Sequence, residues 1–236
     1  MQAITLGRFG GREVLRMSRV SLPSLRPAEV LVRVKAVGVN RGDIVQREGR
    51  YPPPPGASDL LGLEFAGEVA ESRFGWKQGD RVMGILPGGG YAQFAGVHNE
   101  HLVGVPEGMD WSTAGALPEV WMTALQLTAW IARVQPGERV LLHAGASGVG
   151  VALIQLVKAA GAEGFATCGS EAKVQACLAY SYIDWAPPRP ATTRPPTSVT
   201  GCSQALTSFS TLSSLPTSPR ISLLSGRKLA GWCMDS

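Results

Sequence analysis

The chain has 236 residues, of which 44% are hydrophobic and 17% are charged, and its formal net charge is +4. This length allows one large domain or two small ones with a buried core, and a weak charge without a Lys/Arg run argues against a nucleic-acid partner. The four cysteines all lie at or after Cys168 and form no Cys-x-x-Cys motif, which argues against a disulfide framework or a structural zinc knuckle.

The beginning of the chain lacks the basic start and apolar run of a signal peptide. The chain contains no run of about 18 apolar residues, so the sequence predicts no membrane span. We therefore expect a cytoplasmic protein without a membrane partner.

Residues 1 to about 105 predict mainly β-structure. From Val32 to Ala36 apolar and basic residues alternate, which is the period of a half-buried strand. Tyr51 is followed by four prolines, which predict a stiff surface loop. Short strands between Gly/Pro turns predict a compact β-barrel. Strands are expected within 30–37 and 62–70 and at the end of 77–83.

From Pro106 the pattern becomes mixed. A short helix is expected at 112–117, capped by Ser112 or Asp110, and a longer Ala/Leu-rich helix at 121–134. The following segments predict one βαβ unit: a strand at 139–144, a glycine loop at 145–150, a helix at 151–160 that Gly161 ends, and a strand at 165–168.

The glycine loop has the pattern Gly-x-x-Gly-x-Gly, with Ser147 where a Gly-x-Gly-x-x-Gly motif has its middle glycine. A loop between a strand and a helix offers backbone N–H groups to a dinucleotide diphosphate. A tight structural turn explains the same glycines, so both interpretations stand at this point.

The end of the second strand favours NADP(H) over NAD(H), because no acidic residue ends that strand. Ser170 and Lys173 are suited to a 2′-phosphate, through a hydrogen bond and a charge. Glu171 lies beyond the strand, where an acidic residue also stabilises a helix N-terminus.

The last 56 residues differ sharply, with 11 Ser, 7 Thr and 7 Pro in 181–236. No sustained period survives there, and the composition predicts a disordered tail. One βαβ unit alone leaves the edges of its sheet unpaired.

Six motifs in this order resemble the quinone oxidoreductase branch of the zinc-independent medium-chain dehydrogenases/reductases. The resemblance covers about residues 1–180, and the tail beyond it is consistent with a shifted reading frame or alternative splicing. The motifs are Val39–Asp43, Gly49–Ser58, Leu61–Glu64, Leu86–Ala92, Pro118–Ala124 and His143–Gly150.

The resemblance implies an α/β protein with an N-terminal GroES-like catalytic domain (1–118), an incomplete Rossmann, or doubly wound, NADPH-binding domain (119–180), and the unrelated tail (181–236). It implies NADPH as hydride donor, a quinone as acceptor and a homodimer whose dimer-forming strand is missing here. Activity is expected to be weak or lost, and a non-catalytic isoform acting as a binding or regulatory module is the alternative. An enoyl or alkenal reductase is a third possibility.

The resemblance also implies the site residues. The pyrophosphate would lie on Ala144, Gly145, Ala146, Ser147, Gly148, Val149 and Gly150, and the 2′-phosphate on Gly169, Ser170 and Lys173. Asn40, Tyr51 and Ser147 would surround the nicotinamide and the quinone. Tyr51 is otherwise a packing residue beside the proline loop, and Asn40 a turn residue with a local backbone hydrogen bond.

No metal is expected. Zinc-dependent relatives carry Cys where Asn40 stands and His where Leu63 stands, and neither residue present is a suitable ligand. His98 and His101 are expected at the surface, and His143 as a hydrogen-bonded buried histidine.

Overall fold

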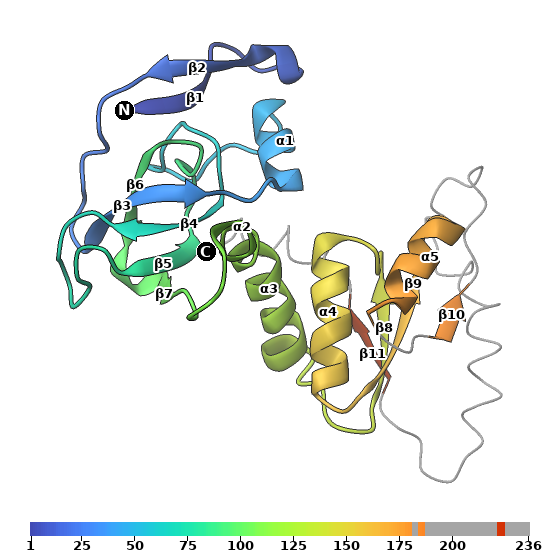
Figure 1. The fold of residues 1–236 in the computed structure, drawn as a ribbon. Coiled ribbons are helices and arrows are strands. Elements are labelled where there is room, and N and C mark those ends of the chain that lie inside the picture. The colour runs from blue at the N-terminus through green and yellow to red at the C-terminus, as the bar shows by residue number, and fades with distance from the viewer. Residues whose placement is uncertain (181–183, 187–220, 225–236) are drawn as a thin grey trace, which may run out of the picture. The chain divides into compact units, whose positions relative to one another are not determined.

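The computed structural model describes residues 1–180, 184–186 and 221–224. The chain divides into two units, Met1–Glu119 and Val120–Ser236 (Figure 1). Within the described residues, no helix has both the length and the apolar character that a membrane crossing requires.

The first unit is built on an antiparallel sheet of five strands in the order β6-β3-β4-β5-β7. In β3, Val30 and Val32 are fully buried whereas Arg33 and Lys35 are exposed, so the predicted alternation is confirmed. Phe65 of β4 is also fully buried in this core. The strands are β3 (Glu29–Ala36), β4 (Glu64–Val69), β5 (Arg81–Ile85), β6 (Phe94–His98) and β7 (Leu102–Gly104).

A two-stranded antiparallel ribbon, β1 (Gln2–Leu6) and β2 (Leu15–Arg19), adjoins this sheet through a bridge between Ala3 and Ala92. The short helices of the unit are η1 (Arg12–Val14), α1 (Arg41–Arg47), η2 (Asn99–His101) and α2 (Trp111–Gly115). Helix α1 was not predicted. For α2, Asp110 rather than Ser112 is the cap, because its carboxylate accepts from the Thr113 N–H at 2.9 Å.

The predicted helix at 121–134 is displaced: α3 (Pro118–Leu125) continues into the π-helical segment η3 (Gln126–Ile131). The Ala132 N–H donates to the Leu127 carbonyl, five residues earlier, at 2.9 Å, so this turn is wider than a turn of an α-helix. The Thr128 hydroxyl donates to the Ala124 carbonyl at 2.9 Å. Arg133 then takes a φ of 51°, and the helix ends before it.

The predicted βαβ unit is confirmed as β8 (Arg139–His143), α4 (Gly148–Ala159) and β9 (Glu163–Thr167), followed by α5 (Glu171–Leu178). Helix α4 begins three residues earlier than expected, because Ser147 is its N-cap. Gly161 ends it with a φ of 73° and an N–H that donates to the Lys158 carbonyl at 3.0 Å.

The expectation of unpaired sheet edges is wrong in the described residues. Strand β10 (Asp184–Ala186) pairs in parallel with β9, and β11 (Ile221–Leu224) pairs in parallel with β8, so the strand order is β10-β9-β8-β11. Stretches of three and four residues are too short to show a period in the sequence. The remainder of the predicted tail, 181–183, 187–220 and 225–236, lies outside the described residues.

Candidate functional site

Two of the loop glycines are required by packing where β8 passes into α4. A Cβ on Gly145 would lie 2.6 Å from the Ala166 Cβ, and one on Gly150 would lie 2.4 Å from the Ala144 carbonyl oxygen. Ala144 itself has a φ of 58°, in the left-handed region. The backbone therefore turns tightly here and keeps the start of the helix close to the strand.

The first turn of α4 presents N–H groups at the surface. The Ser147 hydroxyl accepts from the Gly150 N–H at 3.0 Å, and Ser147 and Gly148 are both exposed. The amides of Gly148 and Val149 are the first two of the helix, so they have no acceptor within it. With the helix dipole, such a terminus favours an anion. The geometry fits a dinucleotide diphosphate.

The predicted 2′-phosphate residues lie at the same edge of the sheet. Strands β8 and β9 are parallel, and His143 is paired with Thr167, so the segments that follow both strands leave the sheet on one side. Gly169, Ser170 and Lys173 are exposed. The Ser170 side chain makes no capping hydrogen bond at the start of α5, which leaves its hydroxyl for another partner.

The Glu171 side chain forms its hydrogen bond within α5. One of its carboxylate oxygens accepts from the Gln175 side-chain amide at 3.0 Å, one helical turn further along. Strand β9 itself ends at Thr167, whose hydroxyl is 3.0 Å from the His143 Nδ1 atom. Among the described residues, the three positions directly after the strand, 168–170, therefore carry no carboxylate for a ribose hydroxyl.

In the first unit, a buried carboxyl group fixes Asn40. The Asn40 Nδ2 atom donates to Glu64 Oε1 at 2.7 Å, and Glu64 Oε2 accepts from the Glu119 N–H at 3.0 Å. Glu64 is 2% exposed, and a Cβ on Gly38 would lie 1.9 Å from its Oε1 atom. Asn40 is thus held by a long-range contact and not only by a local turn.

Asp43 extends this network. Its Oδ2 atom accepts from the Asn40 N–H at 2.7 Å and from the Tyr91 hydroxyl at 2.9 Å, and the residue is 3% exposed. Burial raises the pKa of Glu64 and of Glu119, and the neighbouring carboxylates raise both further. Burial, followed by the charge of Asp43, raises the pKa of Tyr91.

Sequence reasoning missed these carboxyl groups as a network. The available signal was Glu64 itself, an acidic residue inside the otherwise largely apolar segment 62–70. A charged side chain there is either exposed or held by specific partners, and the sequence alone does not distinguish the two.

The remaining site residues are placed as follows. Tyr51 is 41% exposed at the start of the proline loop. Leu63 contacts the Gly42 backbone closely, since a Cβ on Gly42 would lie 2.7 Å from a Leu63 methyl carbon. Asn40 and Tyr51 belong to the first unit and Ser147 to the second.

The three histidines make hydrogen-bond and ring contacts in the described part of the chain. His101 belongs to η2 and His98 lies directly before it, and their ring centroids are 5.4 Å apart. The His98 Nδ1 atom accepts from the Glu100 N–H at 3.3 Å. His143 is half-buried and hydrogen-bonded. Across the part of the chain that the structure describes, no group of three His, Cys, Asp or Glu side chains is placed to hold a metal ion.

Comparisons with known proteins agree with this architecture. Residues 26–107 match the alcohol dehydrogenase GroES-like domain. The quinone oxidoreductase of Rattus norvegicus is 36% identical over 176 residues, which are 72% of this chain and 54% of that protein. The chain therefore spans about half the length of this relative.

Solved structures are similar to both units. Escherichia coli quinone oxidoreductase complexed with NADPH superposes with a TM-score of 0.71 and 30% identity, over 79% of this chain and 58% of that one. CurK enoyl reductase superposes with a TM-score of 0.70 and 32% identity, over 77% of this chain and 58% of that one.

In this chain the GroES-like domain is followed by a parallel sheet with a glycine turn. Over 72% of its length the chain is similar to a quinone oxidoreductase, and residues 26–107 match the GroES-like domain of alcohol dehydrogenases.

Proposed function

We propose that the chain binds NADPH and transfers hydride from it to a quinone without zinc, with weak activity relative to full-length relatives. The observation that carries this proposal is the exposed start of α4, where the Gly148 and Val149 amides lack helical acceptors. The exposed Ser170 and Lys173 at the same edge of the sheet favour NADPH over NADH.

In this proposal the segment 144–150 holds the pyrophosphate through backbone N–H groups. Gly169 allows close approach, and Ser170 and Lys173 bind the 2′-phosphate. Ser147 is already the cap of α4, so its hydroxyl acts chiefly by fixing the loop on which the cofactor rests.

NADPH supplies the hydride, and the protein supplies position and hydrogen bonds. The Asn40 amide uses one N–H on Glu64 and keeps a second for a quinone oxygen. Tyr51 offers a partly exposed hydroxyl beside a rigid loop. A quinone is electron-poor, so these hydrogen bonds suffice to polarise it without a metal.

Purified chain is tested with NADPH and three acceptors: an ortho-quinone, a para-quinone and an α,β-unsaturated ketone. We expect slow NADPH consumption with a quinone and none with the ketone. Consumption with the ketone alone would favour an enoyl or alkenal reductase, the activity named for CurK. If the purified protein binds no NADPH, the proposal is wrong.

A non-catalytic binding or regulatory module is the second candidate, favoured by the Ser/Thr/Pro-rich composition of residues 181–236, which departs from the resemblance. NADPH binding without turnover of any acceptor would support it. Two remaining proposals come from the resemblance: a relationship to the p53-inducible quinone oxidoreductase, and loss of the family's homodimer. A cytoplasmic location is proposed from the sequence pattern alone.

A further inference from the structure

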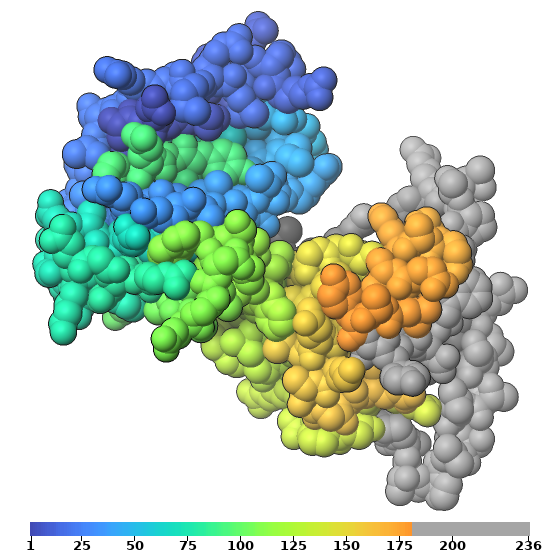
Figure 2. All heavy atoms as spheres, in the orientation of Figure 1, coloured from blue at the N-terminus to red at the C-terminus, as the bar shows by residue number. Residues whose placement is uncertain are grey.

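The positive charge of the chain is concentrated at its beginning. Residues 1–28 contain five arginines and one glutamate, whereas residues 29–236 contain 17 basic and 17 acidic residues. The formal net charge of +4 therefore belongs entirely to the segment that forms the β1–β2 ribbon, η1 and the turn after them. Figure 2 shows these residues in dark blue as one continuous part of the first unit's surface.

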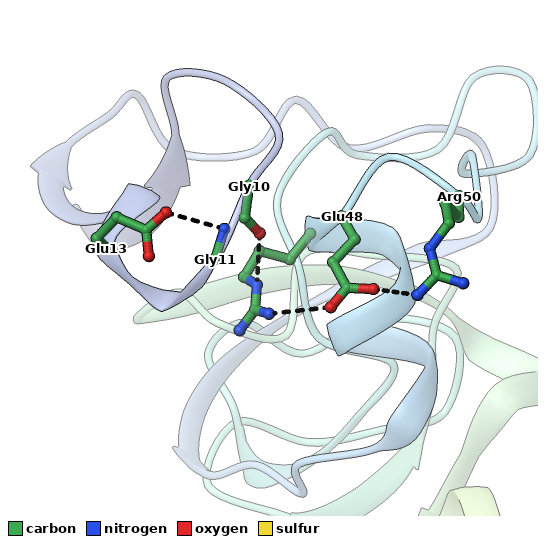
Figure 3. A network of polar contacts seen from close by, with 6 residues as sticks. Gly10, Gly11, Glu13, Glu48 and Arg50 are labelled. Atoms are coloured by element: carbon green, nitrogen blue, oxygen red, sulfur yellow. Dashed lines mark hydrogen bonds and ion pairs between the residues drawn. The ribbon is translucent and has the colours of Figure 1, made fainter.

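The acidic side chains near this segment form no ion pair with its arginines in the described part of the chain. The Glu13 carboxylate accepts from the Gly11 N–H at 3.0 Å, and Glu48 pairs with Arg47 and Arg50 (Figure 3). None of the ion pairs within the described residues includes the arginines of this segment, which are Arg8, Arg12, Arg16, Arg19 and Arg26.

Large apolar side chains are exposed among these cations. Phe9 and Met17 are each 67% exposed, although most side chains of their kind in a folded protein are largely buried. Met17 and Arg19 lie two residues apart on β2 and therefore share one face of the ribbon. Ala3 lies on the opposite face, where it is 2% exposed and bridges Ala92, so the face of Met17 and Arg19 points outward.

The ribbon is held in place before any partner arrives. The Ile4 N–H donates to the Tyr91 carbonyl at 2.8 Å. The Gly10 N–H donates to the Arg47 carbonyl, and the Arg47 side chain donates back to the Gly10 carbonyl, both at 3.1 Å. Binding at this surface would therefore require little ordering of the backbone.

We propose that Arg8, Phe9, Arg12, Met17 and Arg19, here called the ribbon patch, dock the protein on an anionic phospholipid bilayer. Arginine guanidinium groups pair with lipid phosphates, and exposed apolar side chains enter the boundary between headgroups and acyl chains. A soluble polyanion would use the arginines but gain nothing from Phe9 and Met17. This is a peripheral contact, and it depends on neither a membrane span nor the proposed cofactor.

The test is co-sedimentation of the full chain with vesicles of phosphatidylcholine alone or with added phosphatidylserine. We expect binding only with phosphatidylserine, weaker at high salt. Because each arginine near such a surface contributes about 1 kcal/mol, the triple variant Arg8→Gln, Arg12→Gln, Arg19→Gln should bind about 100-fold more weakly. The double variant Phe9→Ser, Met17→Ser should also bind more weakly.

The matched control removes three exposed cations elsewhere, through Arg73→Gln, Lys77→Gln and Lys158→Gln, and should bind like the wild type. All variants are compared by circular dichroism melting to show that they fold. If the control variant loses as much binding as the patch variant, or if Phe9→Ser, Met17→Ser binds normally, the proposal is overturned. Equal binding to heparin and to vesicles, with no effect of the apolar substitutions, would identify a soluble polyanion site instead.

Discussion

Gly150 is the position where one methyl group perturbs the candidate cofactor site most directly. In Gly150→Ala the new Cβ would lie 2.4 Å from the Ala144 carbonyl oxygen and 2.5 Å from the Gly145 carbonyl oxygen. Ordinary contact requires roughly 1 Å more, and both obstacles are backbone atoms that no rotamer change can move. The turn before α4 must therefore open.

Overpacking of this kind costs about 1–3 kcal/mol, which lowers the melting temperature by roughly 4–8 °C near the middle of that range. Opening the turn also displaces the amides of Gly148 and Val149. In a thermal-shift assay, NADPH at about 100 times its Kd should stabilise the wild type by about 2.7 kcal/mol, and Gly150→Ala should show no such shift.

Gly164→Ala is the matched control, because its Cβ would meet only a Val157 methyl group at an ordinary 3.6 Å. It should melt and bind NADPH like the wild type within a few tenths of a kcal/mol. If Gly150→Ala keeps both its melting temperature and its NADPH shift, the placement of a diphosphate on this turn is wrong.

Three further predictions concern single side chains. Lys173→Ala should weaken NADPH binding about 10- to 100-fold without changing NADH binding in a fluorescence titration, whereas Lys158→Ala should change neither. Ser147→Ala should destabilise the protein by about 1 kcal/mol in chemical denaturation, whereas Ser147→Thr should keep most of the wild-type stability. Equal stability of the Ala and Thr variants would contradict the capping role. Burial raises the pKa of Glu64 above its ordinary 4.5 in the folded state, so the contribution of this group to stability is fully present below that pH and is lost as the pH rises through the raised pKa. Glu64→Gln should make the melting temperature depend less on pH. An unchanged dependence of the melting temperature on pH would contradict this role of Glu64.

The βαβ unit and the half-buried strand at 29–36 were predictable because local pattern and tertiary burial agree there. The run Arg139–His143, the glycine turn and Gly161 each carry their own signal in a few residues. The start of α4 was placed three residues late because Gly148 and Gly150 resemble loop residues, whereas the Ser147 cap makes them helical.

The contacts of the first unit were less predictable. Helix α1 has only seven residues. The hydrogen-bond partners of Glu64 lie 24 and 55 residues away in the sequence, and the Tyr91 hydroxyl that donates to Asp43 lies 48 residues away. Strands β10 and β11 are likewise defined by the strands beside them and not by any period of their own. Long-range pairing of this kind leaves no local pattern.

The central claim is that a dinucleotide diphosphate rests on the backbone amides at the start of α4. Hydrogen–deuterium exchange of the purified chain, followed by mass spectrometry of a peptide covering residues 144–150, tests this with and without NADPH. We predict slower exchange in this segment when NADPH is present and no change in a peptide covering β3. Unchanged exchange at 144–150 under saturating NADPH would contradict the assignment.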